Sequence, residues 1–220
     1  MKKVYSGIIY DVVPKVDGII FFCRESEDDV VNVKMLSTSD GRMIDADLYA
    51  YVGCKLGTGA NRVVKYCNNY VLDHVISLAN GETFICKQDG EAYLLDVEGI
   101  AYWSGEIKYR GAPPSSVAFY KNSIWASFCD SNVLIRFNLA TMRTELRIGG
   151  GKTSPFDCPK NIFVDGEWAY ISNSGSKKLI KVNLDDYTVE DYYGFEESIH
   201  AYVKVGRYEF VVLDSGLYVI

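Results

Sequence analysis

The sequence predicts an all-β fold, a five-bladed β-propeller, from two observations. Short runs rich in β-branched and aromatic residues follow one another along the chain, separated by turn residues such as Lys121-Asn122 and Asp130-Ser131-Asn132. A strand pattern also recurs at intervals near the 40–45 residues typical of propeller blades. Five such units account for the 220 residues.

The repeat is clearest in the second half of the chain. The pair Trp125-Ala126, on an expected second strand, recurs as Trp168-Ala169, 43 residues later. The pattern Leu-Ile-basic-apolar-Asn-Leu, on an expected third strand, occurs at 134–139 and again at 179–184. One repeat position is assigned in each blade to Cys23, Cys86, Cys129, Ser172 and Leu213. The cysteines there are expected to pack as small apolar side chains, and Trp125 and Trp168 to fill space between blades.

The repeats set approximate blade boundaries within a single propeller domain. The blades are expected at 8–57, 58–112, 113–153, 154–197 and 198–220 plus 1–7. The longer step from Cys23 to Cys86 predicts an additional stretch at about 48–62. The strand-like segment Lys3–Ser6 is expected to pair with the last blade, which closes the sheet and removes an exposed edge.

Blades three and four resemble NHL-type and related bacterial propellers. In both blades a proline-led segment, Pro114–Val117 and Pro159–Ile162, precedes an aromatic-rich second strand and the Asn-Leu third strand. The resemblance covers about residues 113–190 and implies a propeller fold. Propellers of that type usually carry six or seven blades, so five is a departure.

Composition and charge exclude several classes of function. A net charge of −6 and the absence of a basic stripe argue against nucleic-acid binding. No apolar run approaches membrane length, and Asp11 and Pro14 interrupt the only segment that could resemble a secretion signal. The six cysteines show no Cys-x-x-Cys pair, so thiols and a cytoplasmic location are expected.

Polar residues are expected around the mouth of the propeller channel, where inner strands start and second strands end. The starts of inner strands contribute Asp11, Asp73, His74, Ser116, Asn161 and His200. The ends of second strands contribute Arg24, Lys87, Asp130, Asn173 and Asp214. These eleven side chains form the predicted ligand-binding set.

The leading functional hypothesis is a non-catalytic binding or scaffold propeller without a cofactor. It would recognise a protein or a small ligand, such as a carbohydrate, at the mouth or at an edge rich in exposed tyrosines. Those tyrosines are Tyr120, Tyr170, Tyr187, Tyr192, Tyr193 and Tyr208. Catalysis is disfavoured because no nucleophile, base and orienting group can be assembled from the sequence.

Two alternatives remain open. The first is a metal-dependent, lactonase-like hydrolase, in which one divalent cation is held by Asp11, Asp73, His74, Asn161 and His200. The second is a structural subunit of a larger assembly, such as a viral particle, which predicts a large apolar surface and oligomerisation.

Overall fold

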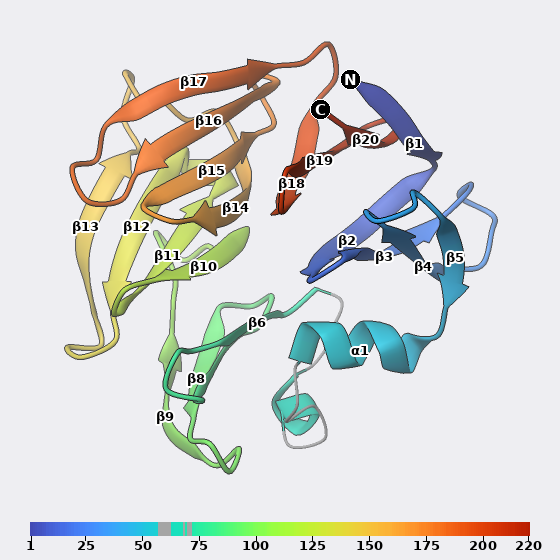
Figure 1. The fold of residues 1–220 in the computed structure, drawn as a ribbon. Coiled ribbons are helices and arrows are strands. Elements are labelled where there is room, and N and C mark those ends of the chain that lie inside the picture. Colours follow the sequence, from blue (N-terminus) through green and yellow to red (C-terminus); the bar gives the residue numbers. More distant parts are fainter. Residues whose placement is uncertain (57–62, 68, 70–71) are drawn as a thin grey trace. The chain divides into compact units, whose positions relative to one another are not determined.

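The described part of the chain forms five four-stranded antiparallel sheets, each of which is one blade (Figure 1). The computed structural model describes residues 1–56, 63–67, 69 and 72–220. The predicted five-bladed β-propeller is confirmed. The blades fall into two compact units, described separately below. Unit 1 consists of Met1–Lys87, Glu91–Gly105 and Val203–Ile220, and unit 2 consists of Gln88–Gly90 and Glu106–Tyr202.

Unit 1 begins with blade 1, whose strands follow chain order. They are β2 (Ile8–Lys15), β3 (Gly18–Arg24), β4 (Asn32–Ser37) and β5 (Met43–Ala46). In β3 the consecutive residues Ile19, Ile20 and Phe21 have no exposed surface. Because successive side chains on a strand point to opposite faces, both faces of this strand are covered.

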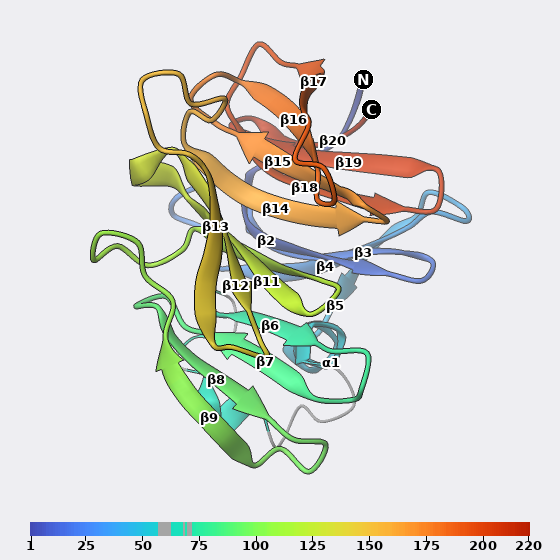
Figure 2. The same cartoon turned by 90° about the vertical axis from the view of Figure 1, so that its left-hand side faces the viewer.

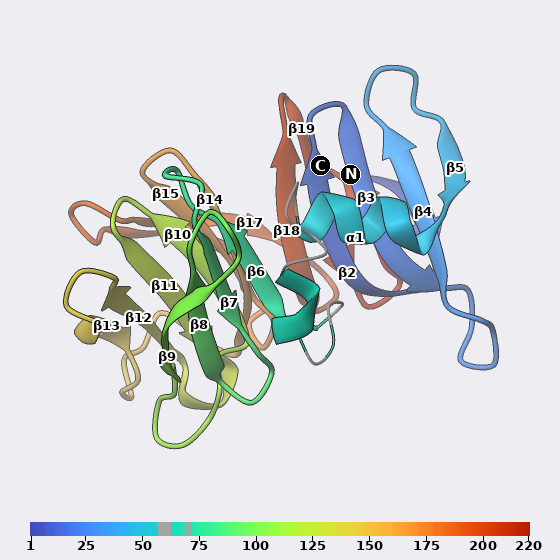
Figure 3. The same cartoon turned by 90° about the horizontal axis from the view of Figure 1, so that it is seen from below.

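A short helix, α1 (Leu48–Leu56), follows blade 1 and begins the additional stretch that the sequence predicted. Its start is capped by Asp47, whose Oδ1 accepts a hydrogen bond from the Ala50 amide at 2.7 Å. Tyr51 is fully buried and packs with Ile20 of β3, which holds the helix against blade 1 (Figure 3). The rest of the predicted stretch, 57–62, lies outside the described residues. No helix in the described part of the chain is long and apolar enough to cross a membrane.

Blade 2 follows the single-turn helix η2 (Val64–Tyr66). Its strands are β6 (His74–Ser77), β7 (Thr83–Cys86), β8 (Glu91–Leu95) and β9 (Ala101–Glu106). Ile85 and Leu95, both without exposed surface, pack with Leu56 of α1. The helix therefore contributes to the cores of two blades.

Blade 5 combines three strands from the C-terminal part of the chain with one from the N-terminal part. They are β18 (Ile199–Val205), β19 (Tyr208–Leu213), β20 (Gly216–Val219) and β1 (Lys2–Ser6), in the order β1-β20-β19-β18. The register of β1 on β20 runs from Lys2 opposite Val219 to Ser6 opposite Gly216. The predicted closure of the last blade by an N-terminal strand is confirmed.

Gly216 shows how tightly β1 fits against β20. Its φ of 136° lies in a region that side chains rarely adopt, and an added Cβ would lie 2.1 Å from the carbonyl oxygen of Tyr5. Only glycine allows the two backbones to approach this closely.

Unit 2 contains blades 3 and 4. Blade 3 consists of β10 (Ser116–Tyr120), β11 (Ser123–Phe128), β12 (Val133–Asn138) and β13 (Arg143–Gly149), with the single-turn helix η3 (Cys129–Ser131) after β11. Blade 4 consists of β14 (Pro159–Asp165), β15 (Trp168–Asn173), β16 (Lys178–Asn183) and β17 (Val189–Gly194). Strand β14 packs beside β10 and β11, so the two blades lie next to each other (Figure 2).

Strand pairing corrects the alignment of the two blades. Trp125 lies opposite Arg136, whereas Lys181, the counterpart of Arg136 in the repeated motif, lies opposite Tyr170. Tyr170 is therefore the counterpart of Trp125, and the match between Trp125 and Trp168 was wrong by two residues. Trp168 is half-buried at the start of β15, beneath the Lys181 ammonium 4.3 Å from its ring centroid.

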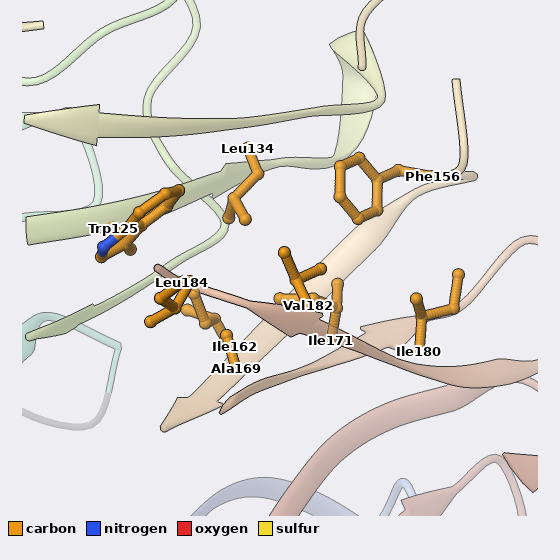
Figure 4. Close-up of a cluster of buried hydrophobic side chains, with 9 residues drawn as sticks. All are labelled: Trp125, Leu134, Phe156, Ile162, Ala169, Ile171, Ile180, Val182 and Leu184. Atoms are coloured by element: carbon orange, nitrogen blue, oxygen red, sulfur yellow. The ribbon is translucent and has the colours of Figure 1, made fainter. Parts of the chain in front are cut away.

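The core of unit 2 lies between its two blades (Figure 4). Trp125 and Leu134 project from blade 3 toward an apolar set on blade 4. That set comprises Ile162, Ala169, Ile171, Ile180, Val182 and Leu184, and Phe156, just before blade 4, joins it. The expectation that Trp125 fills space between blades is confirmed, since 1% of its surface is exposed.

One cysteine pair departs from the expected thiols. Cys129 in η3 and Cys158, just before β14, form a disulfide across 29 residues of sequence. The packing of β11 beside β14 brings the two cysteines together, and their sequence spacing carried no signal of this. Cys129 is therefore not the buried thiol expected from the repeat, whereas Cys23 and Cys86 are fully buried. Among the described residues Cys23, Cys54, Cys67 and Cys86 form no disulfide.

Candidate functional site

A pocket of about 260 Å³ lies in unit 2, beside the core between blades 3 and 4. The turn between β10 and β11 and the turn between β16 and β17 form its rim. The residues that line it are Tyr120, Lys121, Ser123, Trp125, Arg136, Leu184, Asp185 and Tyr187. The pocket therefore collects side chains from both blades of one unit.

Trp125 and Arg136 form one wall of the pocket. They lie directly opposite each other on β11 and β12, so their side chains emerge on the same face of blade 3. The indole ring is 6.2 Å from the ring of Tyr187, measured between centroids. The indole nitrogen points away from Phe156 and the apolar core (Figure 4).

The guanidinium of Arg136 is fixed from both blades. Its Nη1 donates to the hydroxyl of Tyr187 at 2.9 Å, and its Nη2 contacts Glu145 Oε2 at 3.3 Å. These contacts hold the planar group in one orientation before any ligand arrives.

Two nitrogen donors in this wall have no acceptor. Trp125 Nε1 and Arg136 Nε are both buried and make no hydrogen bond within the described residues. A buried donor without a partner costs about 1–3 kcal/mol. Neither nitrogen has accessible surface in this structure, so an oxygen of a bound molecule would recover that energy only with a shift of the surrounding side chains.

An ion pair forms the rim on the other side. Lys121 Nζ lies 2.6 Å from Asp185 Oδ1, and the Tyr120 hydroxyl donates to the same oxygen at 3.1 Å. The hydrogen bond from Lys121 lowers the pKa of Asp185, and the same contact raises the pKa of Lys121. Both groups are therefore charged at neutral pH.

The repeated asparagine explains how Tyr187 reaches the pocket. Asn183 ends β16, and its Oδ1 accepts hydrogen bonds from the amides of Asp185 at 2.9 Å and Asp186 at 3.2 Å. The turn closes with Tyr187 in a left-handed conformation, at φ 66°. The asparagine of the Asn-Leu motif thus forms a turn, and the fourth residue after it is directed into the pocket.

The same turn occurs in blade 3. Asn138 Oδ1 accepts from the amides of Ala140 at 2.7 Å and Thr141 at 3.2 Å, and Met142 follows at φ 54°. Met142 is the counterpart of Tyr187 but does not line the pocket.

The predicted mouth residues lie outside this pocket, each with contacts of its own. Asp11 on β2 accepts a hydrogen bond from the Tyr51 hydroxyl at 2.5 Å and pairs with Lys55 Nζ at 2.6 Å. It therefore anchors α1 to blade 1.

The other predicted residues at the start of unit 1 blades are also engaged locally. Asp73 is fully buried and accepts from the Asn69 amide at 3.0 Å, while His74 begins β6 and is half-buried. Arg24 ends β3 and donates to the Glu27 carbonyl at 2.8 Å.

The two predicted residues at the ends of β7 and β19 differ in how far they are buried. Lys87, just after β7, is 9% exposed and pairs with Glu91 at 2.6 Å; Glu91 also accepts a hydrogen bond from the Tyr93 hydroxyl. Asp214 follows β19 and is exposed.

In unit 2 the predicted residues mostly serve neighbouring backbone. Ser116 Oγ accepts from the Ile162 amide at 3.3 Å, and Asn161 Oδ1 from the Tyr202 amide at 3.2 Å. Asn173 is buried, and its Oδ1 accepts from the Asp157 amide at 2.7 Å. His200 Nδ1 lies 3.2 Å from Lys160 Nζ, and Asp130 is exposed in η3.

The residues proposed to hold a divalent cation can be compared with the structure. Across residues 1–56, 63–67, 69 and 72–220, no three His, Cys, Asp or Glu side chains gather in a way that could hold a metal ion. The five proposed ligands belong to both units. The cation site remains a prediction, which chelation can test.

The tyrosines identified from sequence divide into several groups. Tyr120 and Tyr187 line the pocket. Tyr170 stacks on Tyr202 at 4.9 Å and meets the edge of Tyr192 at 5.1 Å, centroid to centroid. The remaining two lie elsewhere: Tyr193 contacts Phe195, and Tyr208 lies beneath Arg207. The sequence thus identified Tyr120 and Tyr187 as candidate binding residues and Trp125 only as a packing residue, and it missed Arg136 and Asp185. A correct strand register would have placed Arg136 beside Trp125.

Comparisons with known proteins identify the fold. No protein family and no curated protein matches the sequence. A streptogramin B lyase has a TM-score of 0.52 and 9% identity over 98% of this chain and 69% of its own. Virginiamycin B lyase from Staphylococcus aureus has a TM-score of 0.51 and 9% identity over 100% of this chain and 72% of its own.

A third similar structure is U3-55K, with a TM-score of 0.55 and 12% identity over 98% of this chain and 61% of its own. The likeness is one of fold alone. At these identities it carries no function to this chain, and no family model or sequence match names the NHL type.

Proposed function

We propose that this chain is a non-catalytic binding propeller that holds a protein segment or a small ligand in the pocket of unit 2. The observation that carries the proposal is that Trp125 and Arg136 both line a pocket, and each holds a buried donor nitrogen that lacks an acceptor in the described part of the chain. Pockets that bind ligands combine an aromatic lining with a few polar groups held in position.

The way these groups are held supports binding. Arg136 is fixed by Tyr187 and Glu145 without a ligand, so little conformational entropy is lost when a ligand arrives. The Lys121–Asp185 pair shifts both pKa values away from neutrality, whereas a general acid or base works best with a pKa near the working pH. These groups are suited to hold a ligand in place.

The finer expectations from sequence stand as further proposals. They are the relation to NHL-type propellers, a ligand-binding site at the channel mouth and a cytoplasmic location.

A thermal-shift screen can test the proposal. The full chain would be melted against amino acids, carboxylic acids, nucleosides, sugars and short peptides, and each hit repeated with Tyr187→Asn. Asparagine tolerates the left-handed conformation, so this change removes a pocket wall without straining the turn. We expect the hits to lose their stabilising shift.

Met142→Asn is the matched control, because it makes the same change at the equivalent turn outside the pocket. Met142→Asn should keep the stabilising thermal shift of every hit. Hits that respond equally to both variants, or a screen with no hit, would contradict the proposal.

A further inference from the structure

We infer that the pocket of unit 2 takes a neutral, polyhydroxylated ring, a single sugar residue, as its ligand. The inference deepens the proposed function and rests on it. Four properties of the pocket lead to it: the polar atoms left unpaired, the charge balance, the aromatic lining and the size.

The unpaired polar atoms include both donors and an acceptor. Trp125 Nε1 and Arg136 Nε are donors without partners. Both side-chain contacts to Asp185 end on Oδ1, so Oδ2 receives no side-chain donor among the described residues. A sugar hydroxyl can accept from the first two groups and donate to the third, whereas a carboxylate can only accept.

The charges in and beside the pocket cancel. Lys121 is paired with Asp185 at 2.6 Å, and Arg136 with Glu145 at 3.3 Å. A ligand carboxylate would approach two carboxylates that are already in place, and like charges at such a site cost binding energy. A neutral ligand avoids that repulsion.

The lining and the size suit one ring. Tyr120 and Tyr187 are half-buried and present aromatic surface beside Trp125. Aromatic rings offer an apolar face with a polar edge, which matches the C–H faces and hydroxyl edges of a pyranose. At about 260 Å³ the pocket is below the range of drug-sized sites, so it holds one ring and leaves any further sugar units outside.

Ligand-observed NMR titration of the full chain is the test, because a single ring of this size is expected to bind with a Kd on the order of millimolar. The probes are glucose, galactose, mannose, fucose and N-acetylglucosamine, with glucuronate and citrate as charged comparisons. We expect at least one neutral sugar to bind and both acids to bind more weakly or not at all.

Trp125→Phe removes the indole donor and keeps an aromatic side chain, and should weaken sugar binding about three- to tenfold. Trp168→Phe is the control, since Trp168 lies outside the pocket, and should change nothing. Because Trp125 is buried, Asp185→Ala at the exposed rim provides a second variant, with Asp191→Ala as its control. Asp185→Ala should also weaken sugar binding, whereas Asp191→Ala should leave it unchanged.

The outcomes separate this inference from the proposed function. If no neutral sugar binds but another class of molecule does, and Tyr187→Asn abolishes that binding, the sugar assignment is overturned and the binding role stands. If neither sugars nor any screened molecule depends on the pocket, both are overturned. Sugar binding that is unaffected by both pocket variants would also refute the assignment.

Discussion

The contact between β1 and β20 makes a quantitative prediction for Gly216→Ala. The added Cβ would lie 2.1 Å from the Tyr5 carbonyl oxygen, a backbone atom that cannot move without displacing β1. The φ of 136° adds backbone strain of about 1–3 kcal/mol, and overpacking adds a similar amount. We expect a loss of about 4 kcal/mol in the free energy of unfolding, or about 10 °C in Tm for a chain of this size.

Gly206→Ala is the matched control in the same blade. Gly206 also has a positive φ, 58°, but an added Cβ there meets nothing within 4 Å. It should cost only about 1–2 kcal/mol of left-handed strain. The difference between the two variants, measured by urea and thermal unfolding, is the contribution of the clash with β1.

A double-mutant cycle tests the cause. In a chain that lacks Met1–Ser6 the clashing oxygen is absent, so Gly216→Ala should then cost about 2 kcal/mol less than in the full chain. Equal costs in the two backgrounds would refute the argument. The truncation leaves an edge of β20 unpaired and is expected to promote aggregation, so hydrogen exchange of the β1 amides in full-length Gly216→Ala provides a second measurement.

Three further predictions concern covalent, ionic and metal contributions to stability. Replacing Cys129 and Cys158 together by alanine should lower the free energy of unfolding by about 3.5 kcal/mol, because the disulfide closes a loop of 29 residues; urea unfolding beside the oxidised chain checks this. Burial raises the pKa of Cys67 from 9.0 to about 11, so its thiol contributes stability below pH 9 that is lost as pH rises to 11. Between pH 9 and pH 11, Tm should fall less steeply with pH for Cys67→Ala than for the unchanged chain. Equal slopes of Tm against pH would contradict this. The proposed non-catalytic role predicts that EDTA leaves Tm unchanged, whereas a drop in Tm together with one metal ion per chain by mass spectrometry would support the hydrolase alternative.

The strands were predictable because the chain alternates short β-rich runs with turn residues, and the N-terminal strand because the last repeat lacked one. The register of the strands within a blade was not predictable from the sequence. Matching Trp125 to Trp168 relied on identity, whereas the strand ladder pairs Trp125 with Arg136 and Tyr170 with Lys181. A tryptophan can occupy different positions on a strand, so the backbone pairing of the third strand is the more reliable guide.

The candidate site was harder to predict for a different reason. Polar residues at strand starts, such as Ser116 and Asn161, accept hydrogen bonds from backbone amides of neighbouring strands, which is a structural need in any blade. The pocket instead comes from strand and turn segments between residues 120 and 187, and its shape depends on which side chain each turn presents. Sequence alone does not show that Tyr187 and Arg136 meet.

The asparagine turn has a consequence for how such a protein can change. In both blades of unit 2 the turn holds its shape through hydrogen bonds that the side-chain oxygen of Asn138 or Asn183 accepts from backbone amides, independently of the side chain at the left-handed position that follows. That position carries methionine in one blade and tyrosine in the other. The two blades of unit 2 thus share a turn position that accepts different side chains, and in blade 4 a change at that position would alter the lining of the pocket while the turn keeps its shape.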